Sequence, residues 1–162
     1  MELKRISPSS VPRALELGER YRLLNEPEQA ASICRDVLAV EPGNQKAARM
    51  LLLSLTDQFV SRRSSNQEAE RVLEHLTSDY DRAYYAGIVC ERWGRSQLQH
   101  GVPMHLAGEW LQRAMSFYEQ AEQLKPADDD SALLRWNTCA RLFKREPRLA
   151  LAGAKEESLF GD

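Results

Sequence analysis

The stretch YRLLNEPEQAASICRDVLAVEPGNQKAA, residues 21–48, holds the end of one helical pattern, a complete second pattern and the start of a third. An Asn-Glu-Pro sequence at 25–27 interrupts the first pattern, and Pro27 suits the first turn of the next helix. Pro42 cannot continue that helix and therefore ends it. The apolar positions between the two prolines recur at the three- and four-residue spacings of one helical face: Ala30, Ala31, Cys34, Val37 and Leu38.

The same alternation of helix patterns and breaks extends over the rest of the chain. Besides 12–24 and the helix beginning at Pro27, it predicts helices at 45–60, 67–76, 82–95, 106–124 and 128–143. Ser65 or Asn66 is expected to cap the fourth helix, and the acidic run at 128–130 the seventh. Residues 96–105 contain Gly101 and Pro103 and are predicted as a loop or a broken helix. No segment alternates with the period of a strand, so the fold class predicted is all-α.

The composition fits one soluble domain and excludes several classes of protein. The chain has 162 residues, 43% of them hydrophobic and 28% charged, which suffices for a single core. Its net charge of -2 gives no bulk attraction to nucleic acid or to an anionic membrane. We expect no signal peptide and no membrane span, and therefore a cytoplasmic location. The three distant cysteines, Cys34, Cys90 and Cys139, are expected to be free thiols in a reducing compartment.

Residues 11–44 carry a repeat with specific residue types at fixed positions. With Val11 as position 1, the small residues Gly18 and Ala30 fall at positions 8 and 20. The larger residues Leu17, Tyr21 and Val37 fall at positions 7, 11 and 27, and Pro42 falls at position 32. This pattern resembles the tetratricopeptide repeat of 34 residues. Small residues at 8 and 20 allow two helices to approach closely, and the larger ones fill the seam between them.

Later segments resemble the same repeat less closely. Residues 45–79 form a degenerate second repeat, and residues 80–128 a third with an insertion between Gly94 and Ala114. Residues 129–162 would supply a capping helix and a tail. We expect Trp136 on that helix to be half exposed unless the tail covers it.

The resemblance implies a right-handed α-α superhelix of antiparallel helix pairs whose first helices line a concave groove. It further implies a non-catalytic interaction module or scaffold, without cofactor or metal, that binds a peptide or helix of another protein. The mixture of arginines with apolar and aromatic side chains in the expected lining suits a ligand with acidic groups. The residues predicted to contact the partner are Glu19, Arg22, Arg49, Leu53, Tyr84, Ile88 and Arg92.

The carboxylate clamp of this family, which holds the acidic C-terminus of heat-shock chaperones, is not expected here. The clamp requires Lys and Asn where this chain has Leu15 and Glu19, and Asn where it has Met50. Its remaining two basic positions correspond to Asp81 and Tyr85. The Glu19 side chain would repel a carboxylate.

Two alternative functions remain open at this point. A small secretion chaperone would have a similar length and predicts dimerisation and an apolar groove, whereas we expect a monomer or a weak homodimer. A metal-binding or enzymatic protein could use His100, His105 and Glu109, because a His and a Glu four residues apart can share one helical turn. We expect a polar loop there instead, and the chain lacks the common phosphate-binding and hydrolase motifs.

Overall fold

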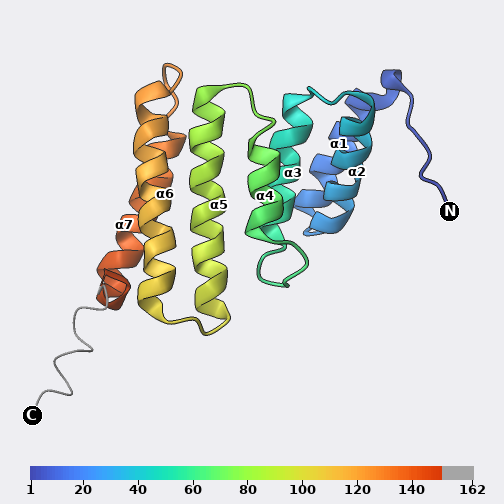
Figure 1. The fold of residues 1–162 in the computed structure, drawn as a ribbon. Coiled ribbons are helices and arrows are strands. Elements are labelled where there is room, and N and C mark those ends of the chain that lie inside the picture. Colours follow the sequence, from blue (N-terminus) through green and yellow to red (C-terminus); the bar gives the residue numbers. More distant parts are fainter. Residues whose placement is uncertain (151–162) are drawn as a thin grey trace, which may run out of the picture.

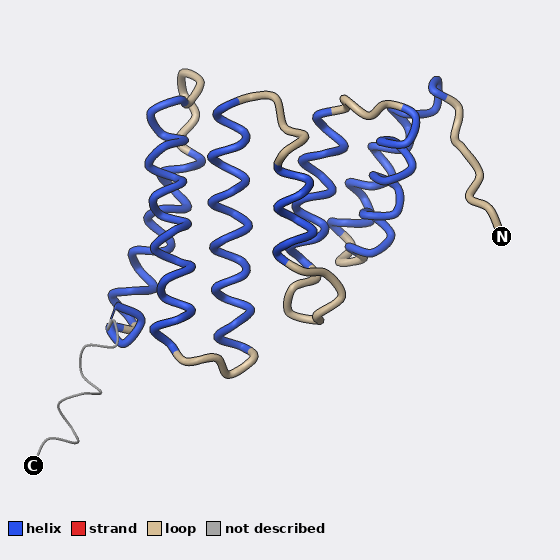
Figure 2. Tube along the Cα trace, in the orientation of Figure 1, coloured by secondary structure: helices blue, strands red, loops and turns tan. Residues whose placement is uncertain are grey.

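The computed structural model describes residues 1–150, and every regular element among them is helical (Figure 2). The prediction of an all-α fold is confirmed. In chain order the elements are η1 (Pro8–Ser10), α1 (Val11–Leu23), α2 (Pro27–Val40), α3 (Gln45–Asp57), α4 (Asn66–Leu73), α5 (Asp79–Gln99), α6 (Met104–Leu124), α7 (Ser131–Arg145) and η2 (Pro147–Ala150), where η denotes a 3-10 helix.

The helices follow one another in space in the order of the chain (Figure 1). Each α-helix packs against the next one, and α3 also contacts both α1 and α5. The pair α1–α2 lies at one end of the described chain and α7 at the other. This arrangement leaves the first helices of successive pairs as neighbours.

Short local signals set most helix ends. After α1, Asn25 adopts a left-handed conformation with φ of 60°, and the Glu26 N–H donates back to the Tyr21 carbonyl. Ser65, one of the two candidates, caps α4 by accepting a hydrogen bond from the Glu68 N–H at 3.2 Å. The side chains of Asn44 and Ser78 cap α3 and α5 in the same way.

Helices α5 and α6 are each 21 residues long. Of the two alternatives predicted for 96–105, a loop or a broken helix, the structure has the broken helix, interrupted at 100–103. Only residues 100–103 connect the two helices. Tertiary packing extends α5, because Ser96 is fully buried and the Cα of Gly94 faces the Ala107 carbonyl and the Trp110 side chain of α6. The insertion relative to a tetratricopeptide repeat therefore lies in two lengthened helices.

Other predicted boundaries were wrong by several residues. Helix α3 ends at Asp57, and the three residues after it lie in turns. Helix α4 ends at Leu73, and α5 begins at Asp79, earlier than expected, because Ser78 caps it. At α7 the acidic run acts through Asp129, whose carboxylate accepts the Ser131 N–H at 2.9 Å. The side chain of the N-cap residue Asp130 makes no capping hydrogen bond and accepts from Lys125 Nζ instead.

Close helix contacts depend on positions without a side chain. A Cβ at Gly87 of α5 would lie 2.4 Å from Cε1 of Tyr118, the largest of the fully buried side chains. Gly18, at position 8 of the first repeat, faces the Met50 sulfur, and Ala30, at position 20, is fully buried. The small residues at these positions do permit close packing.

The short helix η2 covers one side of α6. A Cβ at Gly108 would lie only 1.9 Å from the Leu149 carbonyl oxygen, and Leu149 is 1% exposed. Trp136 is partly buried, and its indole N–H donates to the Glu119 carboxylate at 2.9 Å. Residues 151–162 of the expected tail lie outside the described residues.

Candidate partner-binding surface

A pocket of about 260 Å³ lies where α1, α3 and α5 meet; we call it the α1–α3–α5 pocket. Each of the three helices contributes to its wall. The lining residues are Glu19, Arg22, Lys46, Arg49, Met50, Leu53 and Tyr85.

The pocket brings together four of the residues predicted to bind a partner: Glu19, Arg22, Arg49 and Leu53. The other three predicted residues lie elsewhere on α5. Ile88 is only 3% exposed and packs in the core, so its side chain offers little surface to a partner. Tyr84 is half-buried and stacks on Tyr80 with 5.7 Å between ring centroids.

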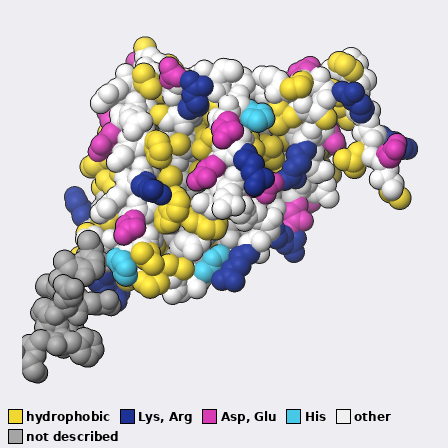
Figure 3. All heavy atoms as spheres, in the orientation of Figure 1, with side chains coloured by type: hydrophobic (Ala, Val, Ile, Leu, Met, Phe, Trp, Pro, Cys, Tyr) yellow, Lys and Arg dark blue, Asp and Glu magenta, His cyan; other side chains and the backbone are white. Residues whose placement is uncertain are grey.

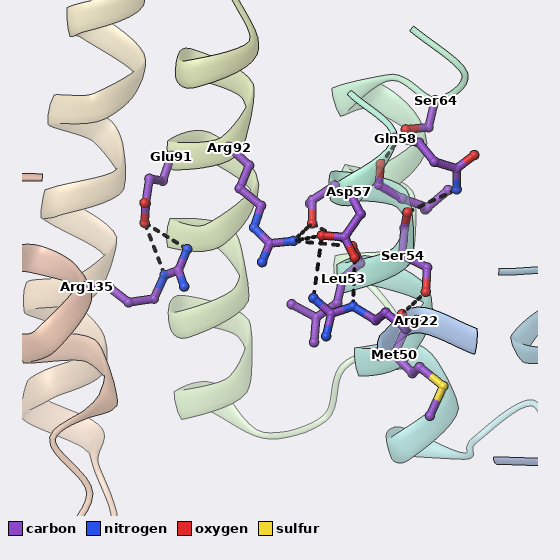
Figure 4. Close-up of polar contacts among 12 residues, drawn as sticks. Arg22, Met50, Leu53, Ser54, Asp57, Gln58, Ser64, Glu91, Arg92 and Arg135 are labelled. Carbon is purple, nitrogen blue, oxygen red and sulfur yellow. Dashed lines mark hydrogen bonds and ion pairs between the residues drawn. The ribbon is translucent and has the colours of Figure 1, made fainter. Parts of the chain in front are cut away.

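Arg92, the seventh predicted residue, is part of an ion-pair triad on the α1, α3 and α5 side (Figure 4). The Asp57 carboxylate accepts from Arg22 Nε at 2.8 Å through one oxygen and from Arg92 Nη1 through the other. The same Arg92 nitrogen also donates to the Thr56 hydroxyl at 2.7 Å. Two guanidinium groups share one carboxylate, so the triad keeps one unit of positive charge beside the pocket.

A second triad of the same composition lies deeper, between α5, α6 and α7. Glu91 is 4% exposed, and its carboxylate accepts from Arg95 Nε and Arg135 Nε, both at 3.1 Å (Figure 4 shows the Arg135 pair). The Tyr118 hydroxyl donates to the same carboxylate at 2.7 Å. A buried carboxylate requires such full pairing, so this triad fixes the three helices relative to one another.

Burial is the largest single influence on the pKa values of Arg92, Tyr118 and Arg135. It lowers the pKa of Arg92, which Asp57 opposes by favouring the charged form. It raises the pKa of Tyr118 far above its usual range, and the nearby Glu91 carboxylate acts in the same direction. Burial alone would lower the pKa of Arg135, but Tyr118 and Glu91 together raise it. Arg92 and Arg135 stay cationic and Tyr118 stays neutral at physiological pH.

The basic side chains of the pocket are only partly neutralised by neighbours. Arg49 donates to the Asp81 carboxylate at 2.9 Å, and Lys46 lies 3.9 Å from Glu19 with both side chains more than half exposed. Three cations and one carboxylate line the pocket itself. An anionic group could therefore bind there by sharing donors that the arginines do not use internally.

The predicted contact residues did not include Lys46, Met50 and Tyr85 of the pocket, nor the adjoining Asp57. Asp57 follows Thr56 on the same face of α3, and the spacing of Lys46, Arg49 and Leu53 along that face continues to it. That spacing was the signal that could have identified Asp57. No comparable signal marks Tyr85, because its position in the wall depends on how α5 packs against α3.

The histidine segment forms no metal site. Among residues 1–150, no group of three or more His, Cys, Asp or Glu side chains is placed to hold a metal ion. His100, His105 and Glu109 are therefore not brought together as ligands. The His100 Nε2 lies 2.8 Å from the Val60 carbonyl oxygen, which joins the α5–α6 loop to the segment after α3.

All three cysteines are buried free thiols, as expected. Burial raises the pKa of Cys34 and Cys139 to about 12 and that of Cys90 to about 11. The thiolate is the nucleophilic form. A thiol whose pKa is raised in this way is a packing residue, and it is no candidate for covalent chemistry.

Comparisons with protein families, with curated proteins and with solved structures found no match for this chain. None of the helices within residues 1–150 combines the length and the apolar character that crossing a membrane requires.

Proposed function

We propose that this protein is a non-catalytic protein-interaction module that binds an acidic peptide or helix in the α1–α3–α5 pocket. The observation that carries the proposal is the lining, in which three cations, Arg22, Lys46 and Arg49, share one pocket with the apolar side chain of Leu53. Glu19 is the single acidic residue of that lining. Arginine can hold a carboxylate through two parallel hydrogen bonds. A half-buried aromatic side chain such as Tyr85 adds contact area at a low entropic cost.

The proposed architecture is a tetratricopeptide-like right-handed superhelix. Its support is the sequence pattern of residues 11–44, together with contacts from α3 to both α1 and α5. In such a superhelix the first helix of each pair lines the concave face. The pocket lies among the first helices, and a partner that followed them would next meet the Asp57 triad.

The lining favours this proposal over a small secretion chaperone, for which we expected an apolar groove. Four of the seven lining residues are charged. In this proposal the protein acts in the cytoplasm, where its buried thiols stay reduced. It acts there as a monomer or a weak homodimer. It needs no cofactor.

Affinity capture from a lysate, followed by mapping of the bound segment, tests the proposal. The test variant is Lys46→Glu combined with Arg49→Glu, which reverses the charge of the pocket. The matched control is Arg20→Glu, an exposed arginine of α1 outside the lining. Circular dichroism must first show that both variants keep the helical content of the wild type.

We expect the wild type and the Arg20→Glu control to capture the same protein through an acidic segment, and the charge-reversed variant to lose it. Capture of the same protein by all three forms would place the binding surface elsewhere. A captured segment without acidic residues would refute the proposed chemistry of the partner.

A further inference from the structure

A second concave surface lies on the α4, α5 and α6 side of the molecule. Three adjoining hollows of about 380 to 510 Å³ run along α6 and share lining residues: Trp110 and Arg113 join two of them, and Phe117 and Gln120 join the next two. Together they form one continuous depression, which we call the α4–α6 groove. Figure 3 shows hydrophobic side chains among charged ones over these helices.

The floor and one wall of the α4–α6 groove are apolar. Small residues of α5 form the floor: Ala83, Ala86 and Cys90. Large side chains of α6 form one wall: Trp110, Phe117 and Leu124, the last of them 50% exposed. Small residues below large ones create the depth that a row of apolar side chains needs.

The opposite wall is acidic. Glu70 of α4 and Glu74, the C-cap residue of that helix, both line the groove and are exposed, and among residues 1–150 neither forms an ion pair. At the same end Asp79 is paired with Arg82. The one other cation of the lining, Arg113, stacks on the Trp110 ring with 4.9 Å between the guanidinium carbon and the ring centroid. The unpaired charge along the α4 wall is therefore negative.

The groove also has the length of a helical ligand. Its lining on α6 runs from Glu109 to Leu124, which is about 22 Å along the helix axis at about 1.5 Å per residue. An amphipathic helix of about four turns would span it. Such a helix binds a groove by placing one apolar stripe into it and keeping its polar face outside.

From this juxtaposition of an acidic α4 wall, a floor of small α5 residues and an aromatic α6 wall, we infer that the α4–α6 groove binds a basic amphipathic helix of a partner protein. Apolar residues of the ligand fill the depression over Ala86, and lysines or arginines on its flank face Glu70 and Glu74. Ala83, Ala86 and Cys90 lie on a different side of α5 from Tyr85, so this surface is separate from the α1–α3–α5 pocket.

Two synthetic amphipathic peptides of about 16 residues test the inference. Both place leucines on one helical face, and the other face carries lysines in one peptide and glutamates in its match. Fluorescence anisotropy measures the affinity of each peptide for the full chain. We expect the lysine peptide to bind about tenfold or more tightly than the glutamate peptide, because only the lysines complement the α4 wall.

Two groove variants and one control locate the binding. Glu70→Lys combined with Glu74→Lys should reverse the preference between the peptides, and Ala86→Gln should weaken the lysine peptide about tenfold by filling the floor. Lys46→Glu, in the other pocket, should leave its affinity within about twofold. The variants change exposed or partly exposed positions, and circular dichroism checks their fold.

Several outcomes would overturn the inference. It fails if the lysine peptide does not bind, if the two peptides bind equally well, or if the Ala86→Gln variant binds like the wild type. Sedimentation of the chain alone provides a further test. Self-association that Ala86→Gln abolishes would make a second copy of this chain the occupant of the groove. Loss of binding only in Lys46→Glu would assign the peptide to the other pocket.

Discussion

The contact between Gly87 of α5 and Tyr118 of α6 predicts a large effect from the addition of one methyl group. In Gly87→Ala the new Cβ would lie 2.4 and 2.6 Å from two carbons of the Tyr118 ring, well inside contact distance. The ring cannot retreat, because Tyr118 is fully buried and its hydroxyl is held between Glu91 and Arg135 at 2.7 and 3.0 Å. The substitution must therefore displace the ring, the helix or both.

The expected loss is about 1.5–5 kcal/mol of unfolding free energy. Overpacking of a core typically costs about 1–3 kcal/mol. Displacing the Tyr118 hydroxyl weakens a hydrogen bond to a charged group, which contributes about 1.5–3 kcal/mol. The higher helix propensity of alanine offsets about 1 kcal/mol of this loss. Such a change is a large fraction of the total stability of an ordinary domain.

Urea denaturation followed by circular dichroism measures the effect, with Gly43→Ala as the matched control. No atom lies within 4 Å of a Cβ at Gly43, so that variant should stay within about 0.5 kcal/mol of the wild type. In a Tyr118→Leu background, Gly87→Ala should cost less, because the ring it collides with is absent. Equal stability of Gly87→Ala and Gly43→Ala, or an equal cost in both backgrounds, would refute the reasoning.

Three further changes have defined outcomes. Gly108→Ala should detach η2 from α6, and amide hydrogen exchange should become faster at residues 148–150; unchanged protection would show that η2 adapts. Asp57→Asn removes the carboxylate that Arg22 and Arg92 share and should lower the unfolding free energy by about 1–3 kcal/mol. This loss should be smaller at high salt, and a salt-independent loss would contradict an electrostatic cause. The thiols of Cys34, Cys90 and Cys139 keep their protons in the folded chain to about pH 11–12, while unfolded thiols lose them near 9.0. Stability should therefore fall as pH rises above about 9, by at most about 1.4 kcal/mol per pH unit for each thiol, and a flat profile in urea titrations from about pH 7 to 10.5 would contradict this.

The helical segmentation of the chain could be predicted because its signals are local. Pro27 begins α2 and Pro42 prevents its continuation, and both effects are independent of the tertiary structure. A serine such as Ser65 likewise caps the helix that follows it directly. Apolar residues at helical spacing likewise require only the period of the helix. The expectation of free thiols followed from the odd number of cysteines and their wide separation in the sequence.

The candidate surfaces could be predicted only in part. The stripe of Arg22, Arg49 and Leu53 was visible as a face of successive helices, and the structure joins these residues in one pocket. The α4–α6 groove has no sequence signature, because its walls come from two helices and its floor from a third. It exists only once α5 lies between α4 and α6.

The sequence by itself determined the number and approximate position of the helices, since each depends on residues within a few turns of one another. The tertiary structure decided where α5 ends, because the burial of Ser96 and the close approach of Gly94 to α6 outweigh the weak local preference of that segment. It also decided which charges pair. Arg92 reaches Asp57, 35 residues away, and Arg135 reaches Glu91, 44 residues away. Such pairings depend on the packing of whole helices, which no short stretch of sequence encodes.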